Sequence, residues 1–310
     1  MLLRDALLAA ARSRRVERLV TRVPVTRHVV ERYVPGTGVD DATRATQELT
    51  SEGLCVSLDF LGEDVETLEQ AAATVQAYLS LLERLAEVGL TDRAEVSVKL
   101  SAVGQSLPHD GESVALDHAR QICENATKHG TTVTLDMEDH TTTDSTLSVL
   151  TALRTDFPAT GAVVQAYLHR TEADCRNLAY EGSRVRLCKG AYDEPESVAY
   201  QSKIDVDRSY VRCLKVLMAG DGYPMIATHD PRLVEITGAL AARYGRAPGS
   251  YEYQMLYGIR PAEQLRLAAE GRAVRVYVPY GDEWYGYLMR RLAERPANLV
   301  FFARSLVSRS

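Results

Sequence analysis

The chain has 310 residues, of which 45% are hydrophobic and 25% are charged, a balance that is ordinary for a folded globular protein and excludes a disordered one. Its formal net charge is −6, from 36 lysines and arginines against 42 aspartates and glutamates, which argues against general nucleic-acid binding. No apolar run approaches the roughly 18 residues that span a membrane. The five cysteines are widely spaced and never form CxxC, and Arg4 and Asp5 interrupt any signal peptide, so we expect a cytoplasmic protein without disulfides or a cysteine-based zinc site.

The first 35 residues are basic, with eight arginines against three acidic residues. Apolar residues recur there at helical spacing, at Leu2, Leu3, Ala6, Leu7 and Ala10. Such an amphipathic helix either packs on the body of the protein, which amphipathicity alone favours, or lies on an anionic membrane. If the helix lies on a membrane, the protein could be a membrane-associated binding protein and not an enzyme. We assign residues 1–50 to an N-terminal helical arm.

After residue 50, short β-like runs alternate with longer helical ones. The predicted strands are 54–60, 94–100, 132–138, 161–168, 184–189, 223–228, 250–255 and 273–279. The predicted helices are 64–88, 112–129, 143–155, 196–219, 231–244, 261–270 and 282–295. The alternation of strands with helices predicts a parallel sheet, and eight such units in about 250 residues fit a closed barrel better than two open sheets. We therefore expect an α/β fold in which residues 51–310 form a (β/α)8 TIM-like barrel.

Polar residues gather where the predicted strands end, which is where barrels of this class carry their chemistry. In chain order they are Lys99, Asp136, Glu138, Asp139, Gln165, Arg186, Lys189, Tyr192, Thr228, His229, Asp230, Glu252, Gln254 and Tyr277. Each one alone is explained more simply as part of a solvated rim. Their density at one end of one barrel predicts a site for a polar ligand.

The last predicted helix carries a second cluster. Tyr287, Arg290 and Arg291 share roughly one face, and Glu294 follows one turn later. The simple interpretation is a surface helix with Glu–Arg pairs. The functional interpretation is a pair of guanidinium groups that clamp a carboxylate, whose geometry they match. Because this helix follows the eighth strand, we expect it to cover the barrel mouth.

Several common motifs are absent from the sequence. Without GxGxxG or GxxxxGK[ST], neither a Rossmann nor a P-loop cofactor site is indicated, and no histidine pattern supports a metal hydrolase. The residues leave one enzymatic alternative open, a metal-dependent or Schiff-base barrel lyase. Its Schiff-base lysine would be Lys99 or Lys189. Its metal ligands would be Asp136, Glu138, Asp139 and His229.

Seven segments in order resemble proline dehydrogenases of the single-function bacterial type. They are SVKLS (97–101), LDMED (135–139), VQAYL (164–168), RVRLCKGAYDE (184–194), IATHD (226–230), YEYQMLYGIRP (251–261) and VRVYVPYGDEWYGYLMRRLAERPAN (274–298). Each segment alone is a weak signal, but KGAY, ATHD, QMLYG and YLxRRLxE at this ordered spacing are highly specific. They cover the barrel from its second strand onward, and nothing in residues 1–50 aligns.

The resemblance implies a distorted (β/α)8 barrel that binds FAD without a Rossmann fold. It implies the first step of proline catabolism, the oxidation of L-proline to Δ1-pyrroline-5-carboxylate by hydride transfer to FAD N5, with a membrane quinone as the electron acceptor. The enzyme would then be peripheral at the inner face of the cell membrane. Because the chain is too short for the second activity of bifunctional relatives, a separate pyrroline-5-carboxylate dehydrogenase would take the product.

The resemblance also implies roles for individual residues. On the substrate side these are Lys99, Asp136, Tyr192, Leu256, Tyr277, Tyr287, Arg290, Arg291 and Glu294. Arg290 and Arg291 would hold the proline carboxylate with Lys99 beside it. Tyr277, Tyr287 and Leu256 would wall the ring, and Tyr277 favours proline over hydroxyproline. Asp136 would support the polar network, Tyr192 would close the site, and Glu294 would pair with the clamp.

On the cofactor side the resemblance implies that FAD contacts Gln165, Arg186, Lys189, Gly190, Ala191, Lys203, Ala227, Thr228, His229 and Gln254. Arg186 would reach flavin N5. One position departs from the family pattern, because Cys188 stands where a valine is usual. A thiol beside the flavin raises the question of its oxidation.

Overall fold

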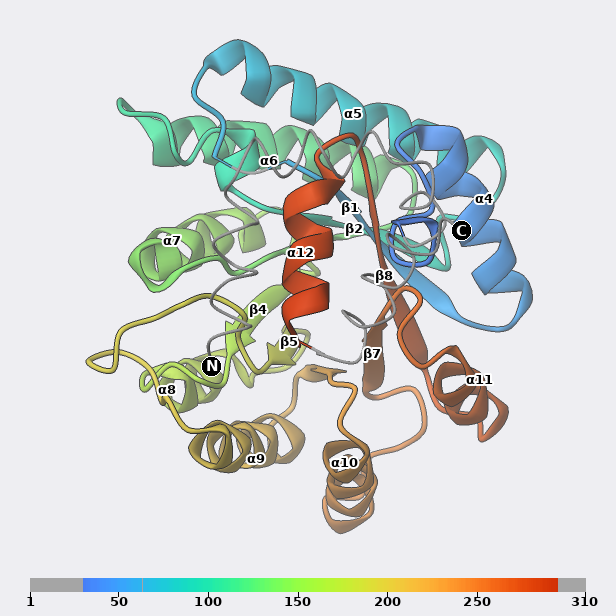
Figure 1. Cartoon of the computed structure of the whole chain (residues 1–310), viewed down its shortest axis with the longest axis vertical. Helices are drawn as coiled ribbons and strands as arrows, with labels where there is room; N and C mark the ends of the chain where they lie inside the picture. The colour runs from blue at the N-terminus through green and yellow to red at the C-terminus, as the bar shows by residue number, and fades with distance from the viewer. Residues whose placement is uncertain (1–29, 63, 295–310) are drawn as a thin grey trace, which may run out of the picture.

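The computed structural model describes residues 30–62 and 64–294, without the side chains of Arg290 and residues 292–294. Eight parallel strands form a barrel with helices around its outside (Figure 1). The strands are β1 (Cys55–Phe60), β2 (Ala94–Val98), β3 (Val133–Leu135), β4 (Ala162–Gln165), β5 (Arg184–Cys188), β6 (Tyr223–Ala227), β7 (Glu252–Leu256) and β8 (Val274–Tyr280). Their order is β3-β2-β1-β8-β7-β6-β5-β4, so β1 pairs with both β2 and β8.

The barrel closes between β3 and β4 through a single parallel bridge from Thr134 to Gly161. Leu135 donates its backbone N–H to the carbonyl of Gly161 at 2.9 Å, and Gly161 donates to Val133 at 2.8 Å. A Cβ atom at Gly161 would lie only 2.5 Å from Oγ1 of Thr134, so the missing side chain lets the two backbones meet. The predicted (β/α)8 class is therefore confirmed.

One described helix, α4 (Val39–Ser51), precedes β1, and the others follow the strands around the barrel. These are α5 (Leu68–Glu87), α6 (Gly111–Lys128), α7 (Thr143–Arg154), α8 (Thr171–Leu178), α9 (Lys203–Ala219), α10 (Pro231–Arg243), α11 (Pro261–Ala269) and α12 (Trp284–Glu294). Two short 3-10 turns, η1 (Ser101–Val103) and η2 (His140–Thr142), follow β2 and β3.

Two helix predictions were wrong. Helix α8 was not predicted, because it has only eight residues and buries only Thr171 and Cys175, too few to produce a clear apolar period. The helix predicted from residue 196 begins instead at Lys203. Ser202 caps it by accepting a hydrogen bond from the backbone of Asp205 at 3.2 Å, which satisfies a free N–H of the first turn.

Alternate residues of the strands face opposite sides of the sheet. Along β1, Val56 and Leu58 join the main hydrophobic core, which includes Leu82 of α5. Ser57 and Asp59 are equally buried but make polar contacts with residues of other strands. The inside of this barrel is therefore polar, unlike the branched aliphatic filling that is usual for the fold.

A second hydrophobic cluster joins the last helix to the start of the described chain. It comprises Tyr33, Val34, Leu61, Tyr285, Tyr287, Leu288 and Met289. Leu61 follows β1, so α12 lies over the ends of the strands, and in Figure 1 it crosses in front of the barrel. The final helix covers the mouth, as predicted.

The predicted basic helix near the N-terminus lies outside the described residues, so the division into an arm of residues 1–50 and a barrel of residues 51–310 stays a prediction. Within that arm the structure describes α4, which packs against α5 and β8. Over residues 30–62 and 64–294, no helix is both long and apolar enough to cross a bilayer.

Candidate active site

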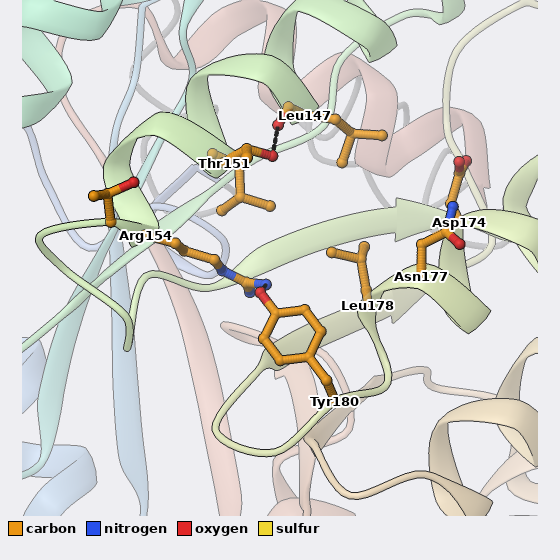
Figure 2. A pocket seen from close by; sticks show the side chains of 9 residues that line it. Leu147, Thr151, Arg154, Asp174, Asn177, Leu178 and Tyr180 are labelled. Atoms are coloured by element: carbon orange, nitrogen blue, oxygen red, sulfur yellow. Dashed lines mark hydrogen bonds between the residues drawn. The ribbon is translucent and has the colours of Figure 1, made fainter.

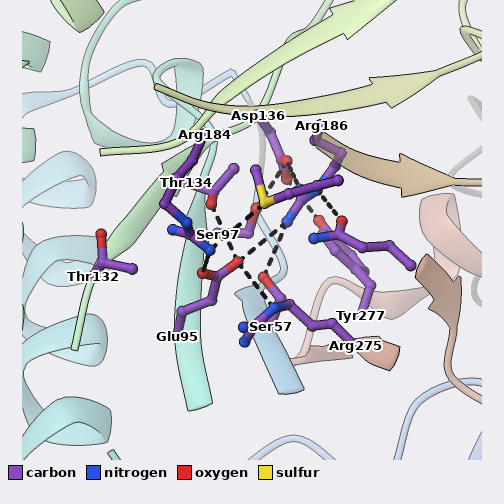
Figure 3. A network of polar contacts seen from close by, with 12 residues as sticks. Ser57, Glu95, Ser97, Thr132, Thr134, Asp136, Arg184, Arg186, Arg275 and Tyr277 are labelled. Carbon is purple, nitrogen blue, oxygen red and sulfur yellow. Dashed lines mark hydrogen bonds and ion pairs between the residues drawn. The ribbon is translucent and has the colours of Figure 1, made fainter. Parts of the chain in front are cut away.

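Arg186 lies at the centre of the polar interior (Figure 3). Its Nη1 donates to Oδ1 of Asp136 at 2.6 Å and to Oγ of Ser97 at 2.9 Å, while Nη2 donates to Oγ of Ser57 at 3.1 Å. Its Nε donates to Oε1 of Gln254 at 2.5 Å. The five side chains lie in or directly after five different strands, and four of them accept hydrogen bonds from the fifth, Arg186. They fix a buried cation between the strands of the barrel.

Asp136 links this arginine to Tyr277. The Tyr277 hydroxyl donates to Oδ2 of Asp136 at 2.7 Å, and Ser97 donates to Oδ1 at 2.8 Å. The guanidinium carbon of Arg186 lies 5.3 Å from the centre of the Tyr277 ring, a cation–π contact. Burial and the negative charge of Asp136 raise the pKa of Tyr277 well above its ordinary value, so the phenol stays protonated and keeps donating.

Lys99 pairs with a residue that the sequence analysis did not single out. Its ammonium lies 2.7 and 2.6 Å from the two carboxylate oxygens of Asp59, and both residues are buried. Burial raises the pKa of Asp59 above its ordinary value, and Asp136 adds to that rise while Lys99 opposes it. The alternating polar residues of β1, Ser57 and Asp59, are the signal that would have found it.

Beneath Arg186, towards the N-terminal ends of the strands, lies a layer of ion pairs (Figure 3). Glu95 lies 2.6 Å from Arg184 and 3.7 Å from both Arg186 and Arg275. Arg275 in turn lies 2.8 Å from Glu252. Burial opposes ionisation of Glu95, but the three arginines outweigh it and lower the pKa of Glu95 to about 2. The sequence analysis identified only Glu252 in this layer.

A cationic group lies at the carboxyl ends of β5 and β6, where α9 and α10 begin. Lys189 lies 2.5 Å from Asp207 and 3.4 Å from Asp230. Lys203 pairs with Asp207 at 2.6 Å, and Arg232 pairs with Asp230 at 3.0 Å. Three cations thus face two carboxylates. The remaining positive charge at two helix N-termini suits an anionic group such as a phosphate.

Gly190 follows β5 in a conformation that favours glycine, with φ +106°. A Cβ atom there would lie 2.3 Å from the ring of Tyr167, so only glycine fits against it. The Tyr167 hydroxyl donates to Glu194 at 3.2 Å, and the ring of His140 contacts the other oxygen of Glu194. These contacts tie the loop after β5, with its half-buried Tyr192, to the neighbouring strand ends.

The remaining predicted cofactor residues lie at neighbouring strand ends. Gln165 donates to the backbone carbonyl of Glu138 at 2.7 Å. Nε2 of His229 accepts the backbone N–H of Leu256 at 2.9 Å, which joins the ends of β6 and β7. Thr228 accepts the backbone N–H of Asp230 at 3.1 Å. Ala227 ends β6 half-buried, while Ala191 is exposed in the loop after β5.

Cys188 ends β5, where its thiol lies 3.5 Å from the carbonyl of Val164. Burial raises the pKa of Cys188 to about 11, and nearby Arg186 opposes that rise only in part. Since the thiolate is the reactive form, this cysteine is poorly suited to oxidation or nucleophilic attack at neutral pH.

The structure describes only part of the predicted carboxylate clamp. The guanidinium carbon of Arg291 lies 5.2 Å from the centre of the buried Tyr287 ring, so the two share a face of α12 as the spacing predicted. Arg290 and Glu294 belong to the same helix, but their side chains lie outside the described residues.

The residues proposed for a barrel lyase are engaged in other contacts. Lys99 and Lys189 each pair with carboxylates, whereas a Schiff-base lysine has to be uncharged. Asp136 accepts from Arg186, and Asp139 caps the turn η2 by accepting from Thr141 at 2.8 Å. Among the side chains that the structure describes, no three His, Cys, Asp or Glu residues are grouped to hold a metal ion.

A pocket on the outside of the barrel lies between α7 and α8 (Figure 2). It is lined by Leu147, Leu150, Thr151, Arg154, Thr155, Asp174, Asn177, Leu178 and Tyr180, none of which was predicted to belong to the site. Arg154 donates to the Tyr180 hydroxyl at 2.6 Å and to the carbonyl of Thr160 at 2.9 Å. Its guanidinium therefore ties the end of α7 to the following loops.

Comparisons with known proteins agree with this architecture. The model of the family described as "Proline dehydrogenase" matches residues 42–304. The chain is 38% identical over 308 residues to a proline dehydrogenase of Deinococcus radiodurans, covering 99% of this chain and 98% of that protein. It is 36% identical over 284 residues to proline dehydrogenase 1 of Bacillus subtilis, covering 92% of each.

The fold resembles that of a solved structure, proline utilization A (PutA) from Bdellovibrio bacteriovorus inactivated by N-propargylglycine. The TM-score is 0.80 at 23% sequence identity, over 92% of this chain and 34% of that one. At this identity the likeness shows the barrel fold alone, and the present chain spans about a third of the longer protein.

Proposed function

The chain belongs to the proline dehydrogenase family, and from that premise we propose that it oxidises L-proline to Δ1-pyrroline-5-carboxylate by hydride transfer to N5 of FAD. The observation that carries this proposal is the Arg186–Asp136–Tyr277 cluster inside the barrel, whose mouth α12 covers. A buried cation held beside a hydrogen-bonded phenol suits a reaction in which negative charge builds up on a flat aromatic acceptor.

The residues present fit two chemically distinct parts of FAD, its diphosphate and its isoalloxazine. The cationic group of Lys189, Lys203 and Arg232 exceeds its two carboxylates by one charge and suits the phosphates. Gly190 lets the loop after β5 pack directly against the Tyr167 ring, which fixes the backbone that follows Lys189. Arg186 supplies a fixed positive charge for the isoalloxazine, with Gln165, Ala191, Ala227, Thr228, His229 and Gln254 around it. When bound, FAD supplies the two-electron acceptor.

In this proposal the substrate is held between α12 and the barrel mouth. Arg290 and Arg291 of α12 bind the proline carboxylate from above, and Lys99 of the barrel approaches it from below. Tyr277, Tyr287 and Leu256 hold the ring, while Tyr192 and Glu294 complete the cover. Fixing both the carboxylate and the ring leaves the substrate little freedom, which favours a close approach of the reacting carbon to its acceptor.

The electrons and the product both have to leave the site. A membrane quinone is the electron acceptor in this proposal, and a separate pyrroline-5-carboxylate dehydrogenase takes the product. The proposal places the contact with the quinone at the inner face of the cell membrane. Turnover with a soluble quinone, compared with turnover in quinone-loaded vesicles, tests this step.

The deciding experiment is the visible absorption spectrum of the purified protein under anaerobic conditions. We expect a yellow protein whose flavin bands bleach when L-proline is added. A colourless protein that takes up no FAD would refute the proposal. Trapping of a carbonyl substrate by borohydride, or inhibition by a chelator, would favour the barrel lyase instead.

A further inference from the structure

The side-chain amide of Gln254 lies between two charged groups of opposite kind. Its Nε2 donates to Oε1 of Glu252 at 2.6 Å, and its Oε1 accepts from Nε of Arg186 at 2.5 Å. A carboxylate only accepts hydrogen bonds and a guanidinium only donates them. The amide therefore has a single orientation that satisfies both neighbours.

Glu252 is itself firmly held. It lies two residues before Gln254 on the same face of β7 and is 2% exposed. Nε and Nη2 of Arg275 donate to its two oxygens at 2.8 and 3.2 Å, and the Tyr223 hydroxyl donates at 3.2 Å. Arg275 is anchored in turn by the backbone carbonyl of Val56 at 2.9 Å. The carboxylate is thus a fixed acceptor.

This chain of contacts ends on the arginine at the centre of the site. The guanidinium group of Arg186 is planar, so holding its Nε–H on Gln254 while Ser57, Ser97 and Asp136 hold the other nitrogens fixes the whole plane. With the amide reversed, its NH2 group would face Nε–H, two donors would meet, and the arginine would have to turn away.

We propose that Glu252 is a positioning residue that orients Arg186 through the amide of Gln254 and so sets the reduction potential of the flavin. The inference rests on the proposed function, because it places Arg186 beside FAD. Replacing Glu252 by glutamine removes the constraint, since a second amide offers a donor or an acceptor equally well. A less ordered guanidinium stabilises the reduced flavin less, so the midpoint potential becomes more negative.

A double-mutant cycle on the FAD-loaded enzyme tests this route, with the flavin midpoint potential and the melting temperature as separate readouts. We expect Glu252→Gln and Gln254→Met each to make the potential more negative and to slow flavin reduction by proline about tenfold, which corresponds to about 1.4 kcal/mol in the barrier. The double variant should have the potential of Gln254→Met alone. The melting temperature should still fall on adding Glu252→Gln, because Arg275 loses its closest carboxylate partner.

The outcomes separate this inference from the proposed function. An unchanged potential in Glu252→Gln, or a shift that persists in the Gln254→Met background, would overturn the inference while the wild-type enzyme still bleaches with proline. A wild-type protein without flavin would overturn the proposed function itself. Should Glu252→Gln not fold, Glu252→Asp withdraws the carboxylate by one methylene, and an unchanged potential in that variant would equally refute the inference.

Discussion

Asp59 presents both carboxylate oxygens to the ammonium group of Lys99, at 2.7 and 2.6 Å, in a place where the two residues are 1% and 7% exposed. The pair joins the ends of β1 and β2 at the barrel mouth. Removing either partner leaves a buried charge without its closest counter-ion, which is far more unfavourable than removing both. The pair is therefore expected to be strongly coupled.

The substitution Asp59→Asn should lower the free energy of unfolding by about 3–5 kcal/mol, since it breaks a buried ion pair. The double variant Asp59→Asn/Lys99→Met should be more stable than the sum of the two single changes predicts. Denaturant unfolding of the four proteins measures the coupling. Additive effects would show that the two groups do not depend on each other.

Acid stability should depend on Glu95, whose pKa is lowered from 4.5 to about 2. A lowered carboxyl pKa stabilises the fold above the unfolded value, and this contribution is lost as the pH falls from 4.5 towards 2. At 1.36 kcal/mol per pH unit the contribution is about 3 kcal/mol. Measured from pH 5 to pH 2, unfolding free energies of Glu95→Gln should fall less steeply than those of the wild type. Equal slopes would contradict the prediction.

Gly190 offers a test of the loop after β5. Alanine there would place a Cβ 2.3 Å from Tyr167, whereas Gly182 has a similar left-handed backbone, φ +79°, with nothing within 4 Å. Gly182→Ala therefore reports backbone strain alone, about 1 kcal/mol. We expect Gly190→Ala to lose a further 1–3 kcal/mol or so from overpacking, and to retain less FAD on gel filtration. Equal destabilisation of the two variants would show that the Tyr167 contact is unimportant.

The strands could be predicted from the sequence because their signal is local: short β-branched and apolar runs, each bounded by turn residues. The ion pairs inside the barrel could not. Glu95 and Arg184 are 89 residues apart, and they meet only because β2 and β5 belong to one closed sheet. Asp59 was not predicted to belong to the site, since the resemblance carried no motif across β1.

The sequence predicted the residues near the strand ends more completely than it predicted the position of α12, the helix that covers the barrel mouth. The residues near the strand ends share one polar interior because each lies within a barrel strand or directly after one; the residues are Lys99, Asp136, Arg186, Gln254 and Tyr277. On α12 the helical period correctly predicted that Tyr287 and Arg291 share a face. The period does not say how a covering helix is rotated over the mouth, because that depends on packing against Tyr33 and Leu61.

The carboxylate clamp is tested by removing its guanidinium groups one at a time. A charge-assisted contact to a carboxylate contributes about 1.5–3 kcal/mol, so Arg291→Ala and Arg290→Ala should each raise KM for L-proline by about 10- to 150-fold. Arg291→Lys keeps the charge but not the planar fork, and should recover part of the loss. Flavin absorption confirms that each variant still holds its cofactor. If KM is unchanged in both alanine variants, the carboxylate is bound elsewhere.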